Sequence, residues 1–328
     1  MNDRNNSPAS EQVSRGLIFA ADLGGTHLRA ATVDRTGRIH FRLKQNTPQV
    51  EDAEQIVEAL VAAVNECEKQ CAGAREQIGA VSVVVPGTVN VEEGTVVKAP
   101  NVPCLDGFRL TEALTRALNR PAILENDANA AAVGEMWQGA GRGHHSIVCV
   151  TLGTGLGGGI VLDGKLWRGA DGSAAEIGHM CVDPFGGVAC GCGSRGCLEV
   201  YASATAIVRM TREARPRHPE SVLRTGESMT SEDVYRAGLK GDELALEVFR
   251  RMGVYLGIGL ANLINILNPE MIVIGGGVVN AWELFEKHMH QQVAERAFPL
   301  PAANVKIVPA QCGDDAGLIG AAWLAINR

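Results

Sequence analysis

The sequence predicts an α/β protein made of two similar halves that face each other across a cleft. The chain has 328 residues, which is more than one compact core usually organises. Its first strand pattern also recurs in its second half. Residues 17–39 and 147–166 each read as a buried strand, a glycine-rich bend, a second strand and a turn, which is the order of a β-hairpin. One glycine loop would therefore lie on each wall of the cleft.

Further helix and strand patterns follow each hairpin. After the first we expect a helix over residues 51–70 and strands over 78–85 and 122–124. After the second we expect helices over 202–213 and 242–267 and strands over 271–274 and 305–308. The division we predict is a disordered tail (1–16), a small α/β domain (17–124, completed by a C-terminal helix over 315–328) and a large α/β domain (125–314).

Composition narrows the class of protein. The formal net charge is −7, whereas a nucleic-acid-binding surface needs clustered Lys and Arg. Residues 1–14 are polar and lack the apolar core of a targeting signal. The most apolar stretch, residues 252–267, contains Asn262 and Asn265 and is shorter than a bilayer requires. We expect a cytoplasmic protein with neither a nucleic-acid nor a membrane partner.

One histidine and three cysteines lie within one short segment of the second half. His179, Cys190, Cys192 and Cys197 can supply the four ligands of a closed tetrahedral zinc shell, which is a structural arrangement. A disulfide and ordinary buried thiols are the alternatives, but the remaining cysteines have no pairing pattern. Cys181 competes for the fourth ligand position and ranks below the histidine. We predict a structural zinc ion in the segment 179–197.

Two glycine loops have the character of phosphate-binding loops. Successive backbone N–H groups in such a loop form a concave nest for phosphate oxygens. Residues 153–158 also match the G-x-G-x-x-G dinucleotide pattern, but that pattern requires a helix directly after the loop. Here a strand follows, so the dinucleotide interpretation fails. Glycines that only allow tight hairpins remain an alternative for either loop taken alone.

A carboxylate lies between the two halves. A strand ending at Leu124 is followed by Asn126 and Asp127 and then by an alanine-rich helix. Either Asn126 or Asp127 could be a helix N-cap. Alternatively, Asp127 enters the cleft as a general base that accepts the proton of a hydroxyl attacking a phosphate.

Taken together, these motifs resemble the ROK family of repressors, uncharacterised reading frames and sugar kinases, from about Leu17 to the C-terminus. The resemblance implies the two-domain actin-like ATPase and hexokinase fold, related to ribonuclease H, with a duplicated α/β core and an interdomain cleft. It also implies ATP-dependent phosphorylation of a hexose with Mg²⁺, of the bacterial glucokinase type.

The resemblance assigns roles to individual residues. Asp127 matches the catalytic base, and Asp22 would lie near the magnesium ion. ATP would be held by three glycine-containing segments, namely Asp22, Gly24, Gly25 and Thr26, then Gly153, Thr154 and Gly155, then Gly275, Gly276 and Gly277. The sugar would contact Gly87, Asn101, Asn126, Asp127, Glu176, His179 and Glu199. His179 would then serve both zinc and sugar, one ring nitrogen each.

Several alternatives remain open. D-Glucose phosphorylated at its 6-hydroxyl is the leading expectation, followed by the N-acetylhexosamines (N-acetylglucosamine and N-acetylmannosamine) and fructose. A sugar-sensing regulator is disfavoured, because only 16 residues precede the first strand. Polyphosphate could replace ATP, although no basic track is evident. Homodimers are common in the family, which makes a homodimer the expected assembly. His27 replaces the Lys or Asn of many members, and we expect it to face solvent.

Overall fold

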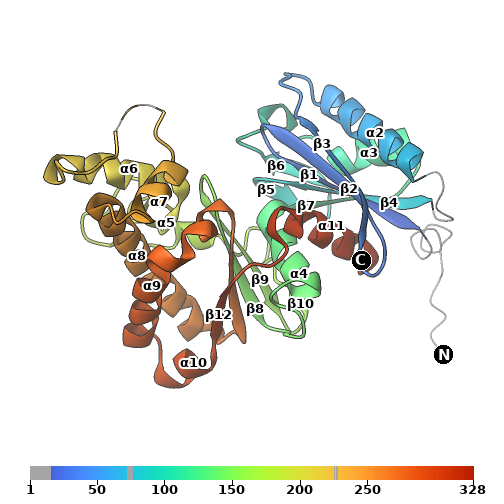
Figure 1. Ribbon diagram of the computed structural model, residues 1–328. Helices are drawn as coiled ribbons and strands as arrows, with labels where there is room; N and C mark the ends of the chain where they lie inside the picture. The colour runs from blue at the N-terminus through green and yellow to red at the C-terminus, as the bar shows by residue number, and fades with distance from the viewer. Residues whose placement is uncertain (1–15, 72–76, 225, 227) are drawn as a thin grey trace.

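Two five-stranded sheets form the framework of the protein in the computed structural model (Figure 1), which describes residues 16–71, 77–224, 226 and 228–328. The first sheet has the order β3-β2-β1-β4-β7 and the second β10-β9-β8-β11-β12. The strands of the first sheet are β1 (Leu17–Leu23), β2 (His27–Val33), β3 (Ile39–Asn46), β4 (Ile78–Val85) and β7 (Ala122–Asn126). Those of the second are β8 (Ile147–Leu152), β9 (Leu156–Leu162), β10 (Lys165–Leu166), β11 (Met271–Gly275) and β12 (Lys306–Pro309).

The two sheets repeat one topology, which confirms the predicted duplication. In the first sheet β1 pairs antiparallel with β2 and parallel with β4, and β4 is parallel to β7. In the second, β8 pairs antiparallel with β9 and parallel with β11, and β11 is parallel to β12. The glycine loops are therefore the two equivalent hairpin turns, β1–β2 and β8–β9. A smaller hairpin is formed by β5 (Thr88–Asn90) and β6 (Thr95–Lys98). No strand was predicted for this segment.

Each central strand divides its side chains between two cores. Leu17, Phe19 and Ala21 of β1 join one cluster, whereas Ile18 and Ala20 join another. This is the two-residue alternation of a strand buried on both faces. The first cluster also contains the apolar faces of α2 (Ala53–Gln70) and α3 (Leu110–Leu118). Strand β8 divides in the same way, since Val148 and Val150 pack toward the outer helices and Ile147 and Cys149 toward the first sheet.

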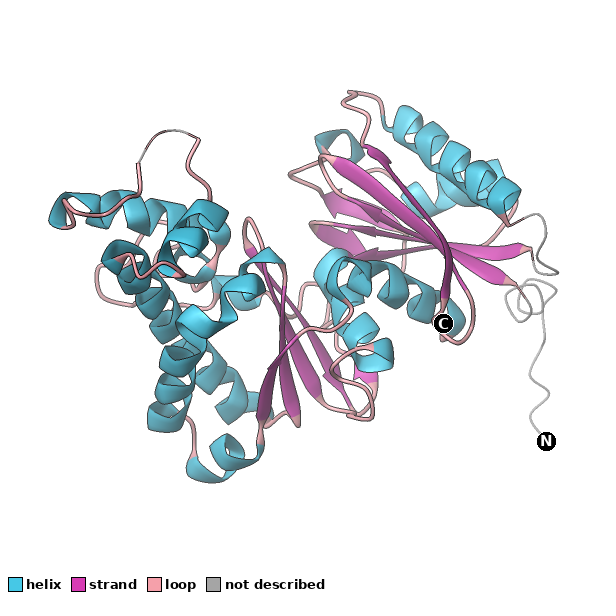
Figure 2. Cartoon of the chain, viewed as in Figure 1, coloured by secondary structure: helices cyan, strands magenta, loops and turns pink. Residues whose placement is uncertain are grey.

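The outer face of the second sheet is covered by a large helical layer (Figure 2). Its core cluster takes buried side chains from α5, α6, α7, α8 and α9. Helix α8 contains the apolar stretch discussed above. Among the described residues, no helix combines the length and apolarity needed to cross a bilayer. The helices of this layer are α5 (Glu199–Ala202), α6 (Ala204–Ala214), α7 (Ser231–Gly238), α8 (Glu243–Leu267), α9 (Trp282–Arg296) and α10 (Pro299–Asn304).

Two helices lie between the sheets and form a shared core. Helices α4 (Asp127–Gln138) and α11 (Ala316–Ile326) contribute to the cluster that also contains residues of both sheets. Small residues let the two helices meet at backbone distance, because a Cβ on Gly320 would overlap the Ala130 carbonyl. The C-terminal helix thus returns to the first sheet, packing on β1 and β4. Helix α4 begins only after β7 has run two residues beyond its predicted end.

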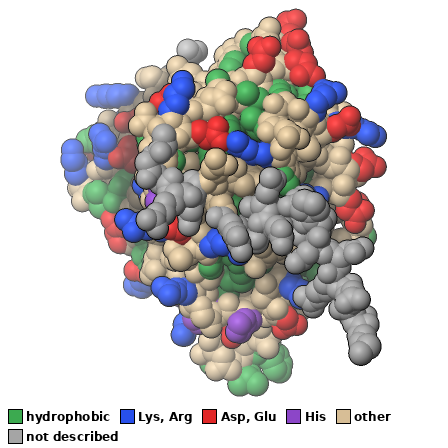
Figure 3. All heavy atoms as spheres, turned by 90° about the vertical axis from the view of Figure 1, so that its right-hand side faces the viewer, with side chains coloured by type: hydrophobic (Ala, Val, Ile, Leu, Met, Phe, Trp, Pro, Cys, Tyr) green, Lys and Arg blue, Asp and Glu red, His purple; other side chains and the backbone are tan. Residues whose placement is uncertain are grey.

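The chain contains similar numbers of basic and acidic residues, 30 and 37. On the face viewed in Figure 3, acidic and basic side chains are interspersed. Of the predicted tail, only Gly16 lies within the described residues, so the prediction for residues 1–15 falls outside them. The nine cysteines are all free thiols, which excludes the disulfide alternative in this structure.

Candidate active site

A cleft of about 920 Å³ lies between the two halves. Both hairpin turns line it, together with the start of α4 and the segment after β11. The structure brings every predicted sugar and nucleotide residue to this one cleft, namely Asp22, Gly24, Gly25, Thr26, Gly87, Asn101, Asn126, Asp127, Gly153, Thr154, Gly155, Glu176, His179, Glu199, Gly275, Gly276 and Gly277.

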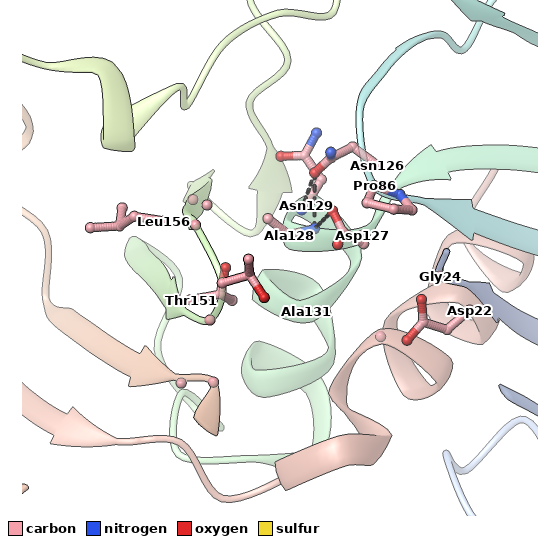
Figure 4. A pocket seen from close by; sticks show the side chains of 18 of the residues that line it. Asp22, Gly24, Pro86, Asn126, Asp127, Ala128, Asn129, Ala131, Thr151 and Leu156 are labelled. Atoms are coloured by element: carbon pink, nitrogen blue, oxygen red, sulfur yellow. Dashed lines mark hydrogen bonds between the residues drawn. The ribbon is translucent and has the colours of Figure 1, made fainter. Parts of the chain in front are cut away.

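Asn126 and Asp127 were both candidates for the N-cap of α4, and the structure distinguishes them. Asn126 is the N-cap of α4, since its Oδ1 accepts from the backbone N–H groups of Ala128 (2.9 Å) and Asn129 (3.0 Å). Its Nδ2 donates to the Gly87 carbonyl at 2.9 Å, so one amide hydrogen is left for a ligand. Because Asn126 provides the cap, the first helical residue, Asp127, can turn its carboxyl into the cleft (Figure 4).

The environment of Asp127 raises the pKa of its carboxyl. Burial is the largest influence and raises its pKa to about 7, and the charge of Asp22 contributes in the same direction. The backbone N–H of Ala128, which donates to Oδ1 at 2.8 Å, acts in the opposite sense. A carboxyl with a pKa near 7 exchanges protons readily at neutral pH, as general acid–base catalysis requires. Figure 4 shows the Asp22 and Asp127 side chains entering the same space from β1 and α4.

Asp22 lies at the end of β1, opposite Arg29 in the register of the hairpin. Burial raises the pKa of Asp22, the nearby Arg29 guanidinium lowers it, and the Asp314 carboxylate raises it. Arg29 in turn lies 3.4 Å from Asp314, at the start of the C-terminal helix segment. Two half-buried carboxyls, Asp22 and Asp127, therefore line the same cleft with the Arg29 guanidinium beside them.

Each glycine loop closes on itself through one backbone hydrogen bond. The Gly24 N–H donates to the His27 carbonyl (3.0 Å), and the Gly153 N–H donates to the Gly155 carbonyl (2.9 Å). These two N–H groups serve the turns, which agrees with the hairpin interpretation, and phosphate binding by the loops stays a prediction. His27 is half-buried and lines the cleft, which differs from the solvent-facing position we expected.

Two of the residues predicted to contact the sugar are glutamates from separate segments, Glu199 and Glu176. Glu199 begins α5, and its Oε2 accepts from the Leu156 N–H at 2.9 Å. Gly155 permits this approach, because a Cβ there would overlap Glu199 Oε2. Glu176 has φ −70° and ψ 55°, with the Ile177 N–H donating to the Ala175 carbonyl at 2.7 Å, so it forms the apex of an inverse γ-turn. The β8–β9 turn thus helps to position Glu199.

The predicted metal-binding residues form one compact cluster. The ligand atoms of His179, Cys190, Cys192 and Cys197 all lie within 4.8 Å of one another. Cys192 Sγ is 3.7 Å from Cys197 Sγ, and Cys190 Sγ is 3.7 Å from His179 Nδ1. A tetrahedral shell with Zn–S bonds of about 2.3 Å separates its sulfur atoms by roughly 3.8 Å. The donor set and its spacing therefore fit a zinc ion, and Cys181 is not part of the cluster.

His179 presents its two nitrogens to different neighbours. Nδ1 faces the thiols, whereas Nε2 lies 3.9 Å from Glu176 Oε2 at the wall of the cleft. The His179 imidazole thus lies between the cysteine cluster and Glu176, which lines the cleft.

The sequence analysis did not predict the ion pair between Glu125 and Arg168, which lies close to Asp127 in the structure. Glu125 is only 1% exposed, and its Oε2 accepts from Arg168 Nε at 2.7 Å. The available signal was an acidic residue within an apolar strand, since such residues are almost never fully buried unless paired. The partner, 43 residues away in the chain, had no sequence signal.

Comparison with known proteins agrees with this architecture. The ROK family model matches residues 18–328. The chain is 36% identical over 315 residues to the glucokinase of Thermotoga maritima, covering 95% of this chain and 98% of that protein. It is 37% identical to a ROK family glucokinase from Streptomyces griseus solved with glucose and AMPPNP, with a TM-score of 0.77 and coverage of 94% and 99%.

A relative of another class has the same core. The xylose repressor of Caldicellulosiruptor bescii is 30% identical over 325 residues, which cover 98% of this chain and 81% of the repressor. The fold is thus the two-domain α/β architecture of the actin-like ATPases and hexokinases, with the ligand cleft between duplicated halves. Within that class the chain belongs to the ROK family.

Proposed function

We propose that this protein is an ATP-dependent hexose kinase that phosphorylates D-glucose at its 6-hydroxyl. The observation that carries the proposal is Asp127, a half-buried carboxyl with a pKa raised to about 7 in the cleft that both glycine loops line. The substrate assignment is supported by relatives named glucokinase at 36–38% identity over most of the chain.

In the proposed mechanism the two walls of the cleft hold different substrates. The glycine turns and the Gly275–Gly277 segment hold ATP, while the side chains of Asn101, Glu176 and Glu199 orient the hexose. Asp127 accepts the proton of the 6-hydroxyl as that oxygen attacks the γ-phosphorus atom, the bond from this phosphorus to the β,γ-bridging oxygen breaks, and ADP leaves. Mg²⁺ bound with ATP supplies neutralisation of phosphate charge, and Asp22 is the residue we assign to it.

For the cluster at residues 179–197 we propose a structural zinc ion. The support is the tetrahedral spacing of four ligand atoms and the absence of a fifth position for a reacting group in a shell filled by protein. Zinc would stabilise the segment that carries His179 at one end and leads into Glu199 at the other. Its chemical contribution would be positional only.

We also propose a division into two domains that follows the sheets except at the end of β7, whose last two residues, Glu125 and Asn126, fall on the large-domain side. The small domain would comprise residues 17–124 with the C-terminal helix, and the large domain residues 125–314. Support comes from α11, which packs on β1 and β4. The chain would then cross between domains at the β7–α4 junction and again just before α11, directly beside Asp127 and Asp314.

The test is a panel of sugars under one set of conditions. We expect kcat/KM for glucose to exceed the values for mannose, fructose, N-acetylglucosamine and N-acetylmannosamine, with ADP release measured in a coupled assay. An N-acetylated sugar well ahead of glucose would retain the kinase and remove the glucose assignment. Sugar binding without turnover of any hexose would favour a regulator of the kind represented by the xylose repressor.

A further inference from the structure

An ion pair whose carboxylate end is buried connects the first sheet to the segment that follows β10 of the second sheet. Glu125 belongs to β7 in the first sheet, whereas Arg168 follows β10 in the second. The Arg168 Nε–Glu125 Oε2 distance is 2.7 Å, and the exposed fractions of the two side chains are 35% and 1%. A buried carboxylate without a cation partner is strongly destabilising, so each residue constrains the position of the other.

The second oxygen of Glu125 holds the segment that carries the base. Glu125 Oε1 accepts from the backbone N–H of Asn126 at 3.0 Å and from Asn129 Nδ2 at 3.1 Å. Asn126 caps α4, and Asp127 is the first residue of that helix. The position of the Asp127 carboxyl therefore depends on a carboxylate that is itself held by Arg168.

On the other side, Arg168 starts the loop that ends at Glu176. Its carbonyl accepts from the Ala174 N–H at 3.1 Å, which closes the loop. Ala175 then adopts φ 67°, a left-handed conformation that is unfavourable for a residue other than glycine. Residues in such conformations persist when their surroundings fix them, and here the closed loop and the inverse γ-turn at Glu176 do so.

The same loop extends across the cleft to the small hairpin. A Cβ placed on Gly172 would lie 3.1 Å from the carbonyl oxygen of Val89 in β5. Gly172, Glu176 and Gly87 all line the cleft, so the loop covers the region where the sugar residues gather. Its attachments include the Val89 contact at the tip, the Ala175 carbonyl beside Gly158 of β9, and the Arg168–Glu125 pair at the base.

We propose that Arg168 and Glu125 form a positioning pair that couples the hexose-contacting loop, residues 168–176, to the catalytic base Asp127. The pair aligns the sugar and the base together and has no role in nucleotide binding. This inference rests on the proposed hexose kinase function.

The experiment compares the wild type with Arg168→Ala, Glu125→Gln and the double variant. Glutamine has one acceptor oxygen in place of two, so Glu125→Gln loses either the Arg168 bond or the bonds to Asn126 and Asn129. We expect Arg168→Ala to raise the KM for glucose at least about tenfold and to lower kcat about tenfold, with the KM for ATP within about twofold of wild type.

The double variant separates positioning from stability. Arg168→Ala alone leaves a buried unpaired carboxylate, and adding Glu125→Gln removes that charge, so the melting temperature should recover. The KM for glucose should stay raised, because the connection to the loop is still absent. Arg42→Ala is the matched control, since Arg42 makes two similar hydrogen bonds to Asp315 outside the cleft lining, and its KM for glucose should equal that of wild type.

Three results would overturn the proposal. They are a glucose KM in Arg168→Ala within twofold of wild type, equal factors of increase for glucose and ATP, and recovery of glucose KM along with melting temperature in the double variant. If the wild type prefers another hexose, the same ratios are measured with that hexose. Failure of the glucose assignment is thereby distinguished from failure of the positioning pair.

Discussion

Replacing Asp127 by Asn tests the base directly, because the substitution keeps size and removes the ionisable proton acceptor. A positioned base contributes about two to four orders of magnitude to rate, so turnover of Asp127→Asn should fall at least about a hundredfold. Glucose affinity, measured by titration calorimetry, should stay within a few-fold of wild type. Asp163→Asn makes the same chemical change in the β9–β10 turn, outside the cleft lining, and should leave turnover unchanged.

The raised pKa of Asp127 also predicts a pH profile. Because the base must be ionised, kcat/KM for glucose should rise with pH to a plateau, with a midpoint near pH 7. Asp22 and Asp127 repel each other when both are charged, so the midpoint belongs to the pair. Positive charge brought to Asp22 by MgATP should lower the pKa of Asp127. We therefore expect the limb in kcat, at saturating MgATP, to lie at lower pH than the limb in kcat/KM.

The same pKa has a consequence for stability. Each pKa unit corresponds to about 1.4 kcal/mol, and the rise is from 3.8 to about 7. Ionising Asp127 therefore costs on the order of 4 kcal/mol more in the folded protein than in the unfolded chain. This group's contribution is intact below pH 4 and is lost as pH rises to 7. Asp127→Asn should thus be more stable than wild type above pH 7, with a stability advantage that shrinks on acidification.

Two outcomes would refute this reasoning about the base. Turnover of Asp127→Asn within tenfold of wild type would reduce Asp127 to a structural residue at the start of α4. A wild-type profile that is flat between pH 5.5 and 8.5 would show that no carboxyl with a pKa near 7 limits the reaction.

Three further predictions follow from particular contacts. Cys192→Ala should lose zinc and stability, since metal binding and local folding are one equilibrium in such sites, whereas Cys181→Ala should retain zinc by elemental analysis. Gly155→Ala should displace Glu199 and raise the KM for glucose at least about tenfold; in Gly153→Ala, where an added Cβ has open space, glucose KM should stay near wild type. Gly320→Ala should cost about 1–3 kcal/mol in urea unfolding, because α4 and α11 meet there at backbone distance; full stability would contradict that packing.

Local signals were enough to predict the two hairpins. Leu17–Leu23 and Ile147–Leu152 are apolar runs bounded by glycine turns, and their partners follow within a few residues. Short-range pairing of this kind leaves its pattern in contiguous sequence. The duplication was predictable for the same reason, because each half contains a buried strand, a glycine-rich turn and a second strand in the same order.

Other elements have weaker patterns. Helix α9, Trp282–Arg296, buries only four residues, Phe285, Met289, Gln292 and Val293, so its apolar face is too narrow to stand out among polar neighbours. The β5–β6 hairpin consists of strands of three and four residues, which are too short for alternation to be read. Both elements are fixed by tertiary packing more than by their own residues.

The predicted sugar and nucleotide residues do line one cleft, whereas the contacts that connect them were not predicted. The sequence predicts that Asp127, His179 and Glu199 matter, because their chemistry and neighbours are local. It contains no trace that Glu125 meets Arg168, or that Gly155 makes room for Glu199, since these contacts join segments more than 40 residues apart. The cap at Asn126 is intermediate, because spacing left two candidates and only the backbone geometry chose between them.

The charged residues of the cleft determine what kind of phosphate donor it can accept. Among its described lining residues, the lysines and arginines are Lys98 and Arg29, and both are already paired, with Asp106 and Asp314 respectively. The centre of the cleft instead contains Asp22 and Asp127, whose burial disfavours ionisation. A polyphosphate anion entering alone would face these carboxyls with little free positive charge. The cleft therefore favours a phosphate donor that carries its own divalent cation, and that cation would in turn favour the ionised form of Asp127 needed to accept the hydroxyl proton.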